Sequence, residues 1–108
     1  MFKWLSACVE VLSRSGKWKI VRLRHLEREP FCQACRREDD LEVHHIHPVR
    51  AGGDELDHAN LITLCHHCHF CLGHACNWLS WRPDVVYLAA YIRRAKVEKS
   101  VNPDRNSA

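Results

Sequence analysis

The sequence lacks several features that would assign the protein to a class at once. It has no uninterrupted apolar run of about eighteen residues, so a transmembrane helix is not expected. Glu10 interrupts the apolar stretch at the N-terminus, which is therefore too short for the apolar region of a signal peptide. Repeats and low-complexity tracts are missing, and a net charge of +3 does not by itself indicate a partner. We expect one cytoplasmic, intracellular domain over residues 1–108 with no membrane partner.

Cysteine and histidine, in contrast, are abundant. The chain has seven Cys and nine His, and six of these Cys and eight of these His lie between Cys32 and Cys76. A domain this small buries a limited share of its surface, so a staple beyond the apolar core is expected. An odd number of cysteines in a reducing compartment favours metal binding over a disulfide framework.

Two cysteine pairs have the spacing of zinc knuckles. Cys32 and Cys35 form one Cys-x-x-Cys pair, and Cys65 and Cys68 form the other. This spacing lets two thiolates bind one tetrahedral Zn²⁺, whereas a thioredoxin-like redox pair needs a βαβ context that the pattern does not offer. The 29 residues between the pairs exceed the usual zinc-ribbon gap of about 15–20. We therefore predict a structural zinc site that encloses a substructure of its own.

The hydrophobic pattern predicts helices at both ends and short strands in the middle. Helical spacing indicates N-terminal helices within about 3–28, the second over about 17–27, and a C-terminal helix over about 84–98. The tail over 101–108 is expected to be frayed. Strands are expected over 41–46 and 61–64, with a loop over 49–59 between them and a helix that begins near Cys65. The fold class is therefore α+β.

The segment over 32–69 resembles a known family. It contains, in order, C-Q-A-C, L-E-V-H-H-I-H-P, A-G-G-D and N-L-I-T-L-C-H-H-C-H. These elements closely resemble the HNH endonucleases that carry a four-cysteine zinc site. The resemblance implies a zinc-stapled ββα-metal motif with a core over 32–74. In this motif a strand bears the His pair, and an irregular loop, a second strand and a helix with the last His follow.

The same resemblance implies a role for each polar residue of the motif. His44 takes the place of a ligand of a catalytic divalent ion, and His45 takes that of the general base. Asn60 matches the middle Asn, which either binds the metal or holds the base in position. His69 matches the closing His, a second ligand of the catalytic metal. Plainer alternatives are that the His pair lies exposed at a strand end, that Asn60 is a turn residue, and that His69 replaces a cysteine at the zinc.

These residue types suit the hydrolysis of a phosphodiester. A neutral imidazole takes a proton from water near neutral pH, and a divalent ion held by imidazoles keeps open positions for the phosphate and the leaving oxygen. We expect a metal-dependent DNA endonuclease that uses Mg²⁺, Mn²⁺, Ni²⁺ or Zn²⁺ at His44 and His69. The resemblance implies products with 5′-phosphate and 3′-hydroxyl ends. An ideal strand points His44 and His45 to opposite faces, so both can act on one phosphate only where the strand twists or bulges.

Basic segments flank an acidic, His-rich middle. Residues 1–31 hold seven Lys/Arg and three Asp/Glu, residues 32–69 hold three and seven, and residues 70–108 hold six and three. We expect DNA phosphates to contact basic residues of the second and last helices, although a solvated face is the alternative. These candidates are Lys17, Lys19, Arg22, Arg24, Arg93, Arg94 and Lys96. Sequence specificity is expected to come from a homodimer or a partner, because so small a domain has little surface for reading a long site.

Other interpretations of the sequence stay open. The main alternative is a zinc-stapled nucleic-acid-binding module without catalysis, and RNA is the alternative substrate. The run from Cys65 to Cys76 offers eight side chains of metal-ligating type in twelve residues, of which the resemblance uses three. We expect His66 and His67 to face solvent or nucleic acid. For the remaining three residues, Cys71, His74 and Cys76, packing or surface roles are expected, and a part in another metal site is the alternative.

Overall fold

The computed structural model describes residues 16–101, which form three helices and a two-stranded sheet. The elements in chain order are α2 (Trp18–Arg28), β1 (Leu41–His45), β2 (Leu61–Cys65), α3 (His66–Cys68) and α4 (Val85–Val101). Two 3₁₀ turns, η1 (Val49–Ala51) and η2 (His58–Asn60), lie between the strands, and a π-helical turn, η3 (His69–Gly73), continues α3. The helix expected before residue 16 and the frayed tail after residue 101 lie outside the described residues.

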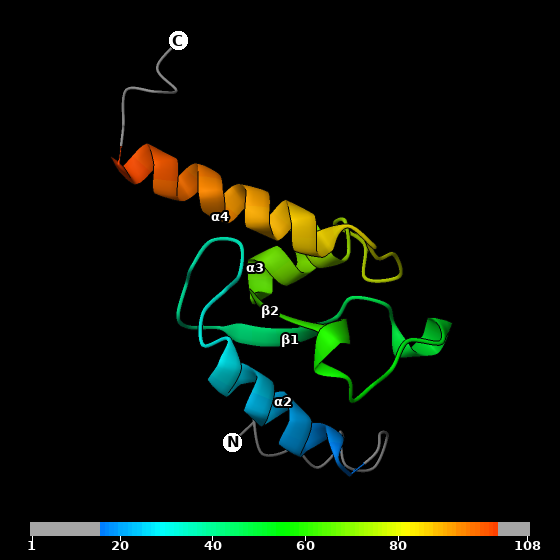
Figure 1. The fold of residues 1–108 in the computed structure, drawn as a ribbon. Helices are drawn as coiled ribbons and strands as arrows, with labels where there is room; N and C mark the ends of the chain where they lie inside the picture. The colour runs from blue at the N-terminus through cyan, green and yellow to red at the C-terminus, as the bar shows by residue number, and fades with distance from the viewer. Residues whose placement is uncertain (1–15, 102–108) are drawn as a thin grey trace.

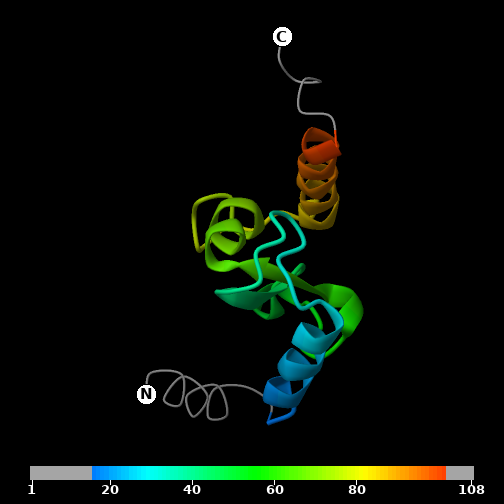
Figure 2. The same cartoon turned by 90° about the vertical axis from the view of Figure 1, so that its left-hand side faces the viewer.

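The sheet separates the helices into two groups. β1 and β2 are antiparallel, with Leu41 opposite Cys65 and His45 opposite Leu61. Helix α2 lies on one side of the sheet, whereas α3 and α4 lie on the other (Figures 1 and 2). Covered in this way, all five residues of β2 are buried, which accounts for a continuous apolar strand instead of an alternating one.

The core sits where β2, the cysteines and α4 meet. Its buried members are Cys32, Ala34, Ile62, Leu64, Cys65, Cys68, Val85 and Ala89. Helix α2 buries Trp18 and His25, which are two helical turns apart and therefore lie on the same face. The four cysteines thus belong to the core itself, between the strands and the last helix.

The α+β fold class expected from the sequence is confirmed. The strands and α2 begin and end within one residue of their expected positions, and α4 begins one residue later and extends to Val101. The helix after β2 is a single α-helical turn followed by the π-helical turn, a change of helix type that the hydrophobic pattern did not indicate. The substructure between the two cysteine pairs is the β1–β2 hairpin with its long loop.

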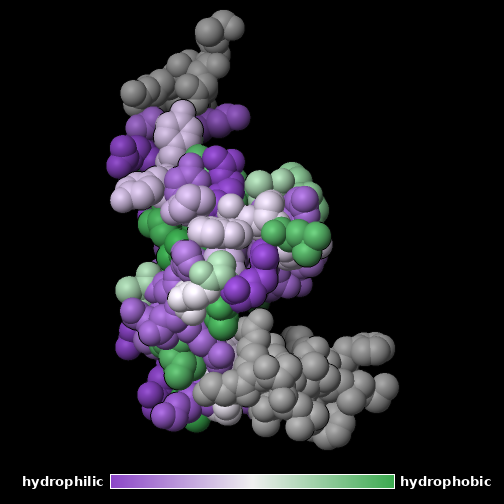
Figure 3. All heavy atoms as spheres, turned by 90° about the vertical axis from the view of Figure 1, so that its right-hand side faces the viewer, coloured by the Kyte–Doolittle hydropathy of each residue, from purple (hydrophilic) through white to green (hydrophobic). Residues whose placement is uncertain are grey.

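Within residues 16–101, no helix has both the length and the hydropathy needed to cross a bilayer. On the face in Figure 3, hydrophilic residues are interspersed with small, separate groups of hydrophobic ones.

Candidate functional site

The four paired cysteines converge on one point. Their sulfur atoms all lie within 4.8 Å of one another, and the Sγ atoms of Cys35 and Cys65 are 3.7 Å apart. Cys32, Cys65 and Cys68 are buried. Four sulfurs at this separation form a donor set of the kind that binds a single tetrahedral metal ion.

Backbone hydrogen bonds shape both pairs into knuckles. The N–H of Cys35 donates to Cys32 Sγ at 3.4 Å, and the N–H of Cys68 donates to Cys65 Sγ at 3.5 Å. Burial tends to raise the pKa of Cys32, but hydrogen bonds from the backbones of Cys35, Cys65 and Ala34 outweigh it and lower this pKa to about 7. Burial raises the pKa of Cys35 and Cys68. Thiolates packed this closely repel, so the cluster fits a bound Zn²⁺, whose charge allows all four to ionise.

Helix α4 holds the first knuckle in place. The guanidinium of Arg93 donates to the backbone oxygen of Gln33 at 2.6 Å and to its side-chain oxygen at 3.2 Å. The ammonium of Lys96 donates to the carbonyl of Cys35 at 3.3 Å. Arg93, expected to contact DNA, is therefore engaged with the knuckle, and its charge lies beside the cysteine cluster.

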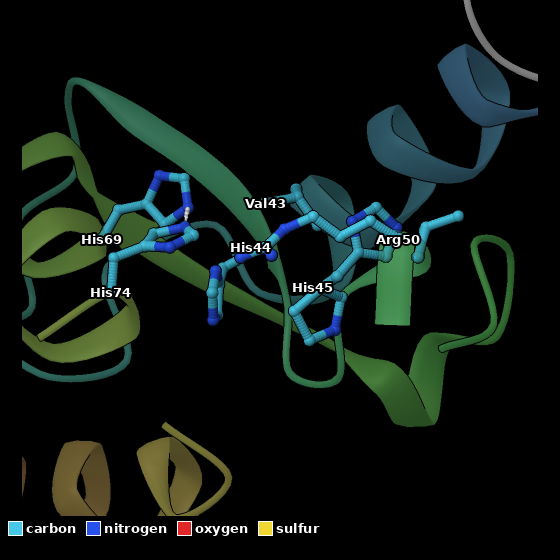
Figure 4. Close-up of a pocket in the computed structure, with 8 residues that line it drawn as sticks. Val43, His44, His45, Arg50, His69 and His74 are labelled. Atoms are coloured by element: carbon cyan, nitrogen blue, oxygen red, sulfur yellow. Dashed lines mark hydrogen bonds between the residues drawn. The ribbon is translucent and has the colours of Figure 1, made fainter. Parts of the chain in front are cut away.

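A second cluster consists of three histidines. One ring nitrogen each from His44, His69 and His74 lies within 4.8 Å of the other two. His44 comes from β1, whereas His69 and His74 come from η3 and its C-terminal end. Figure 4 shows His69 and His74 facing each other, with their Nε2 atoms 3.2 Å apart.

The outer hydrogen bonds of two histidines determine their tautomers. His69 Nδ1 lies 2.7 Å from a carboxylate oxygen of Glu42, and His74 Nδ1 lies 2.7 Å from the carbonyl oxygen of Ser80. Both oxygens accept, so in each neutral ring Nδ1 carries the proton and Nε2 carries a lone pair. Two lone pairs facing each other at 3.2 Å repel unless a cation lies against them. This arrangement fits a metal ion whose histidine ligands are oriented by outer hydrogen bonds.

Burial favours the neutral, metal-binding form of His44 and His69. His44 is 2% exposed, and its Nε2 is buried without a hydrogen-bond partner. Burial, with smaller contributions from His69 and His74, lowers the pKa of His44 to about 3. Burial also lowers the pKa of His69, although Glu42 opposes this shift. The His44 ring contacts the rings of His69 and His74, with centroids 4.9 Å from each, so a ligand role accounts for a buried nitrogen without a partner.

The π-helical turn brings His69 and His74 together. The N–H of His74 donates to the carbonyl of His69, five residues earlier, at 3.1 Å. This wider turn places residues five apart on one side of the helix. Gly73 completes the arrangement: a Cβ there would lie 3.1 Å from Cε1 and 3.2 Å from both nitrogens of the His44 ring. A glycine therefore leaves room for that ring.

His45 is oriented by its surroundings. Its Nε2 lies 3.0 Å from the carbonyl oxygen of Glu55 and donates to it, so Nδ1 is the basic nitrogen of the neutral ring. The indole of Trp18 packs against the imidazole, with ring centroids 4.5 Å apart. The tautomer and the ring orientation of His45 are thus both constrained.

Asn60 holds the loop that orients His45. Its Nδ2 donates to the carbonyls of His47 and Asp54 at 3.0 and 2.8 Å, and its Oδ1 accepts from the N–H of His47 at 2.9 Å. Asp54 directly precedes Glu55, whose carbonyl binds His45. The Asn60 amide, which was expected either to bind the metal or to hold the base in position, is therefore directed at the loop backbone. The third ring beside His44 and His69 is that of His74.

A cleft of about 260 Å³ connects these groups. It is lined by Val43, His44, His45, Pro48, Val49, Arg50, His69 and His74. β1 pairs with β2 along one edge only, and side chains from both of its faces reach the cleft. In Figure 4, His69 and His74 lie to one side of His44, and His45 and Arg50 lie to the other. Strand alternation predicted that the adjacent His44 and His45 point to opposite faces, yet both side chains line one cavity.

The predicted DNA contacts fall on two separate surfaces. Lys17, Lys19 and Arg24 are exposed on α2, where Arg22 is half-buried, and Arg94 is exposed on α4. These helices lie on opposite sides of the sheet (Figure 1). The seven predicted contacts therefore do not form one continuous basic surface.

Sequence reasoning missed Glu42 and Arg50, and it favoured a packing or surface role for His74 over a part in a metal site. His74 is five residues from His69, a spacing that matches only a π-helical turn, so helical periodicity gave no reason to pair them. Glu42 precedes His44 by two positions, and strand alternation places both on one face, which was a usable signal. Nothing local indicated that Arg50 would line the cleft.

Comparison with known proteins identifies one family. Residues 32–74, somewhat less than half of the chain, match the family described as HNH endonuclease. No curated protein and no solved structure matches the chain. The family match indicates a nuclease or another nucleic-acid-related function, and the cysteine and histidine clusters are compatible with metal binding. Residues 32–74 are thus similar to the HNH endonuclease family, and the four cysteines fit the zinc site expected for it.

Proposed function

We propose that this protein is a metal-dependent DNA endonuclease. One observation carries the proposal: a candidate base, His45, lines the same cleft as three imidazoles arranged to hold a metal ion. General-base and metal-assisted hydrolysis of a phosphodiester requires these two parts side by side.

His44, His69 and His74 would hold the catalytic divalent ion, and Cys32, Cys35, Cys65 and Cys68 would hold a structural Zn²⁺. When bound, the catalytic ion supplies a Lewis acid that polarises the phosphate and stabilises the leaving 3′ oxygen. Glu42 and Ser80 keep the protons of His69 and His74 on the outer nitrogens. The inner nitrogens are thereby left as ligands.

His45 takes the proton from the attacking water. The hydrogen bond from its Nε2 to Glu55 would make Nδ1 the proton-accepting nitrogen, and Trp18 packs against the ring. Asn60 is a positioning residue, because it fixes the loop on which Glu55 lies. The products would carry 5′-phosphate and 3′-hydroxyl ends, and a homodimer or a partner would supply sequence specificity.

Plasmid nicking tests the proposal. Purified zinc-loaded protein is incubated with supercoiled plasmid in Mg²⁺, Mn²⁺, Ni²⁺ or EDTA, beside His45→Ala, His74→Ala and the matched control His67→Ala, which removes an exposed imidazole from the same run. We expect metal-dependent nicking that falls by about a hundredfold or more in the first two variants and persists in the control.

Two other results would contradict the proposal. If every variant nicks like the wild type, a contaminating nuclease is responsible and the assigned residues are wrong. If the plasmid stays intact while the protein retards it on a gel, the protein is a nucleic-acid-binding module, and a parallel incubation with RNA tests the remaining substrate.

A further inference from the structure

Arg50 lies in the cleft beside the candidate reactive groups. It belongs to η1, which begins directly after the buried Pro48 and follows the strand that carries His44 and His45. It is the one Lys or Arg among the eight residues that line the cleft (Figure 4). No Asp or Glu is among those eight residues, so the charge of Arg50 adds to the positive potential of a bound divalent ion.

A hydrogen bond to a backbone carbonyl tethers this guanidinium. Arg50 Nη2 donates to the carbonyl oxygen of Leu79 at 2.8 Å, which links η1 to the segment between η3 and α4. A carbonyl accepts a hydrogen bond without neutralising the charge. Because a guanidinium has five N–H donors in a rigid plane, this contact leaves donors for a second ligand.

Arg50 differs from the two arginines that form ion pairs with nearby carboxylates. Arg37 pairs with Asp39, and Arg82 pairs with Asp84. Among residues 16–101, no carboxylate lies within ion-pair distance of Arg50. A fixed cation in a cleft, tethered but not neutralised, is suited to an anionic ligand.

We propose that Arg50 forms an anion subsite that binds non-bridging oxygens of a nucleic-acid phosphodiester in the cleft. The inference rests on the proposed function for the identity of the anion. Arginine recognises phosphate by parallel N–H donors, so the tether to Leu79 would orient the fork and reduce the loss of side-chain freedom on binding. Arg50 would thus hold the phosphate between His45 and the histidine cluster.

The test compares Arg50→Gln and Arg50→Lys with a control of equal charge change, Lys99→Gln, at the far end of α4. Binding of a fluorescent DNA duplex is measured by anisotropy at several salt concentrations, with His45→Ala added to each protein so that no cleavage occurs. Plasmid nicking is measured without that change, and the affinity for Mn²⁺ is measured by calorimetry.

For Arg50→Gln we expect kcat/KM to fall about tenfold to a hundredfold, as for a lost charge-assisted hydrogen bond. The slope of log affinity against log salt should become shallower by about 0.9, the value for one phosphate contact. Arg50→Lys should give an intermediate result because it keeps the charge and loses the fork. Affinity for Mn²⁺ should not change.

Several outcomes would overturn the inference. If the wild type nicks DNA and Arg50→Gln behaves like Lys99→Gln, the anion subsite is wrong while the nuclease stands. A weaker Mn²⁺ affinity in Arg50→Gln would show a structural role instead. If the wild type binds the duplex through Arg50 without cleaving it, the anion subsite is supported and the proposed nuclease activity is wrong. If it neither binds nor cleaves DNA, both proposals are wrong.

Discussion

At the scale of single residues, the histidine cluster depends on a glycine, Gly73, which has no side chain. Gly73 lies against the His44 ring, which is 2% exposed. Interiors are close-packed, so an added methyl group there must displace the ring or the π-helical turn.

Gly73→Ala is therefore expected to lower the free energy of unfolding by about 1–3 kcal/mol and to weaken divalent-ion binding at the histidine cluster. Denaturant unfolding and metal titration measure the two effects. Gly16→Ala is the control, because a Cβ at Gly16 meets nothing within 4 Å. If Gly73→Ala and Gly16→Ala have equal stability and metal affinity, the His44 ring moves aside without loss of free energy and the prediction is wrong.

Residue identities were predicted from the sequence to different extents. From the sequence, Asn60 could be recognised only as a residue that either binds the metal or holds the base in position. Its three hydrogen bonds to His47 and Asp54 form only in the folded loop. Spacing alone does not reveal such contacts, because they depend on how the chain between the strands returns to its start.

At the scale of elements, β1 contributes more than the histidine pair. Glu42 lies on the same face as His44, and its carboxylate accepts hydrogen bonds from His69 at 2.7 Å and from His66 at 3.1 Å. Burial opposes ionisation of Glu42, yet the two histidines lower its pKa below the usual value. The strand thus supplies both a candidate ligand and the carboxylate that hydrogen-bonds a second candidate ligand on η3.

Glu42→Gln should weaken divalent-ion binding about tenfold to a hundredfold, because an amide orients the His69 tautomer less strongly than a carboxylate does. Calorimetric titration with Mn²⁺ measures the change. Glu38→Gln, in the exposed turn before β1, removes the same charge away from the cluster. An unchanged affinity in Glu42→Gln would mean that the position of His69 is set by packing alone.

At the scale of the whole molecule, the cysteine cluster joins the parts of the fold. One knuckle precedes β1, the other lies at the junction of β2 and α3, and Arg93 and Lys96 connect α4 to the first. A structural zinc site contributes on the order of 10 kcal/mol to folding, comparable to the whole stability of a small domain.

Removal of zinc by a strong chelator is therefore expected to unfold the domain, as measured by circular dichroism together with the zinc content. Zinc added back should restore the signal. His44→Ala should keep the fold and the zinc while losing the second, weaker ion, which separates the two sites. A zinc-free protein with an unchanged spectrum would contradict the proposed staple.

The sequence by itself determined the strands, the main helices, the two knuckles and the family, because apolar periodicity and short spacings are local properties of the chain. Only the tertiary structure placed His74 and Arg50 at the candidate site. His74 reaches His69 through a π-helical turn, and Arg50 is tied to Leu79, 29 residues away. The open edge of β1 also brings His44 and His45 into one cleft. These arrangements depend on how segments that are distant in the sequence pack together, so local sequence patterns do not predict them.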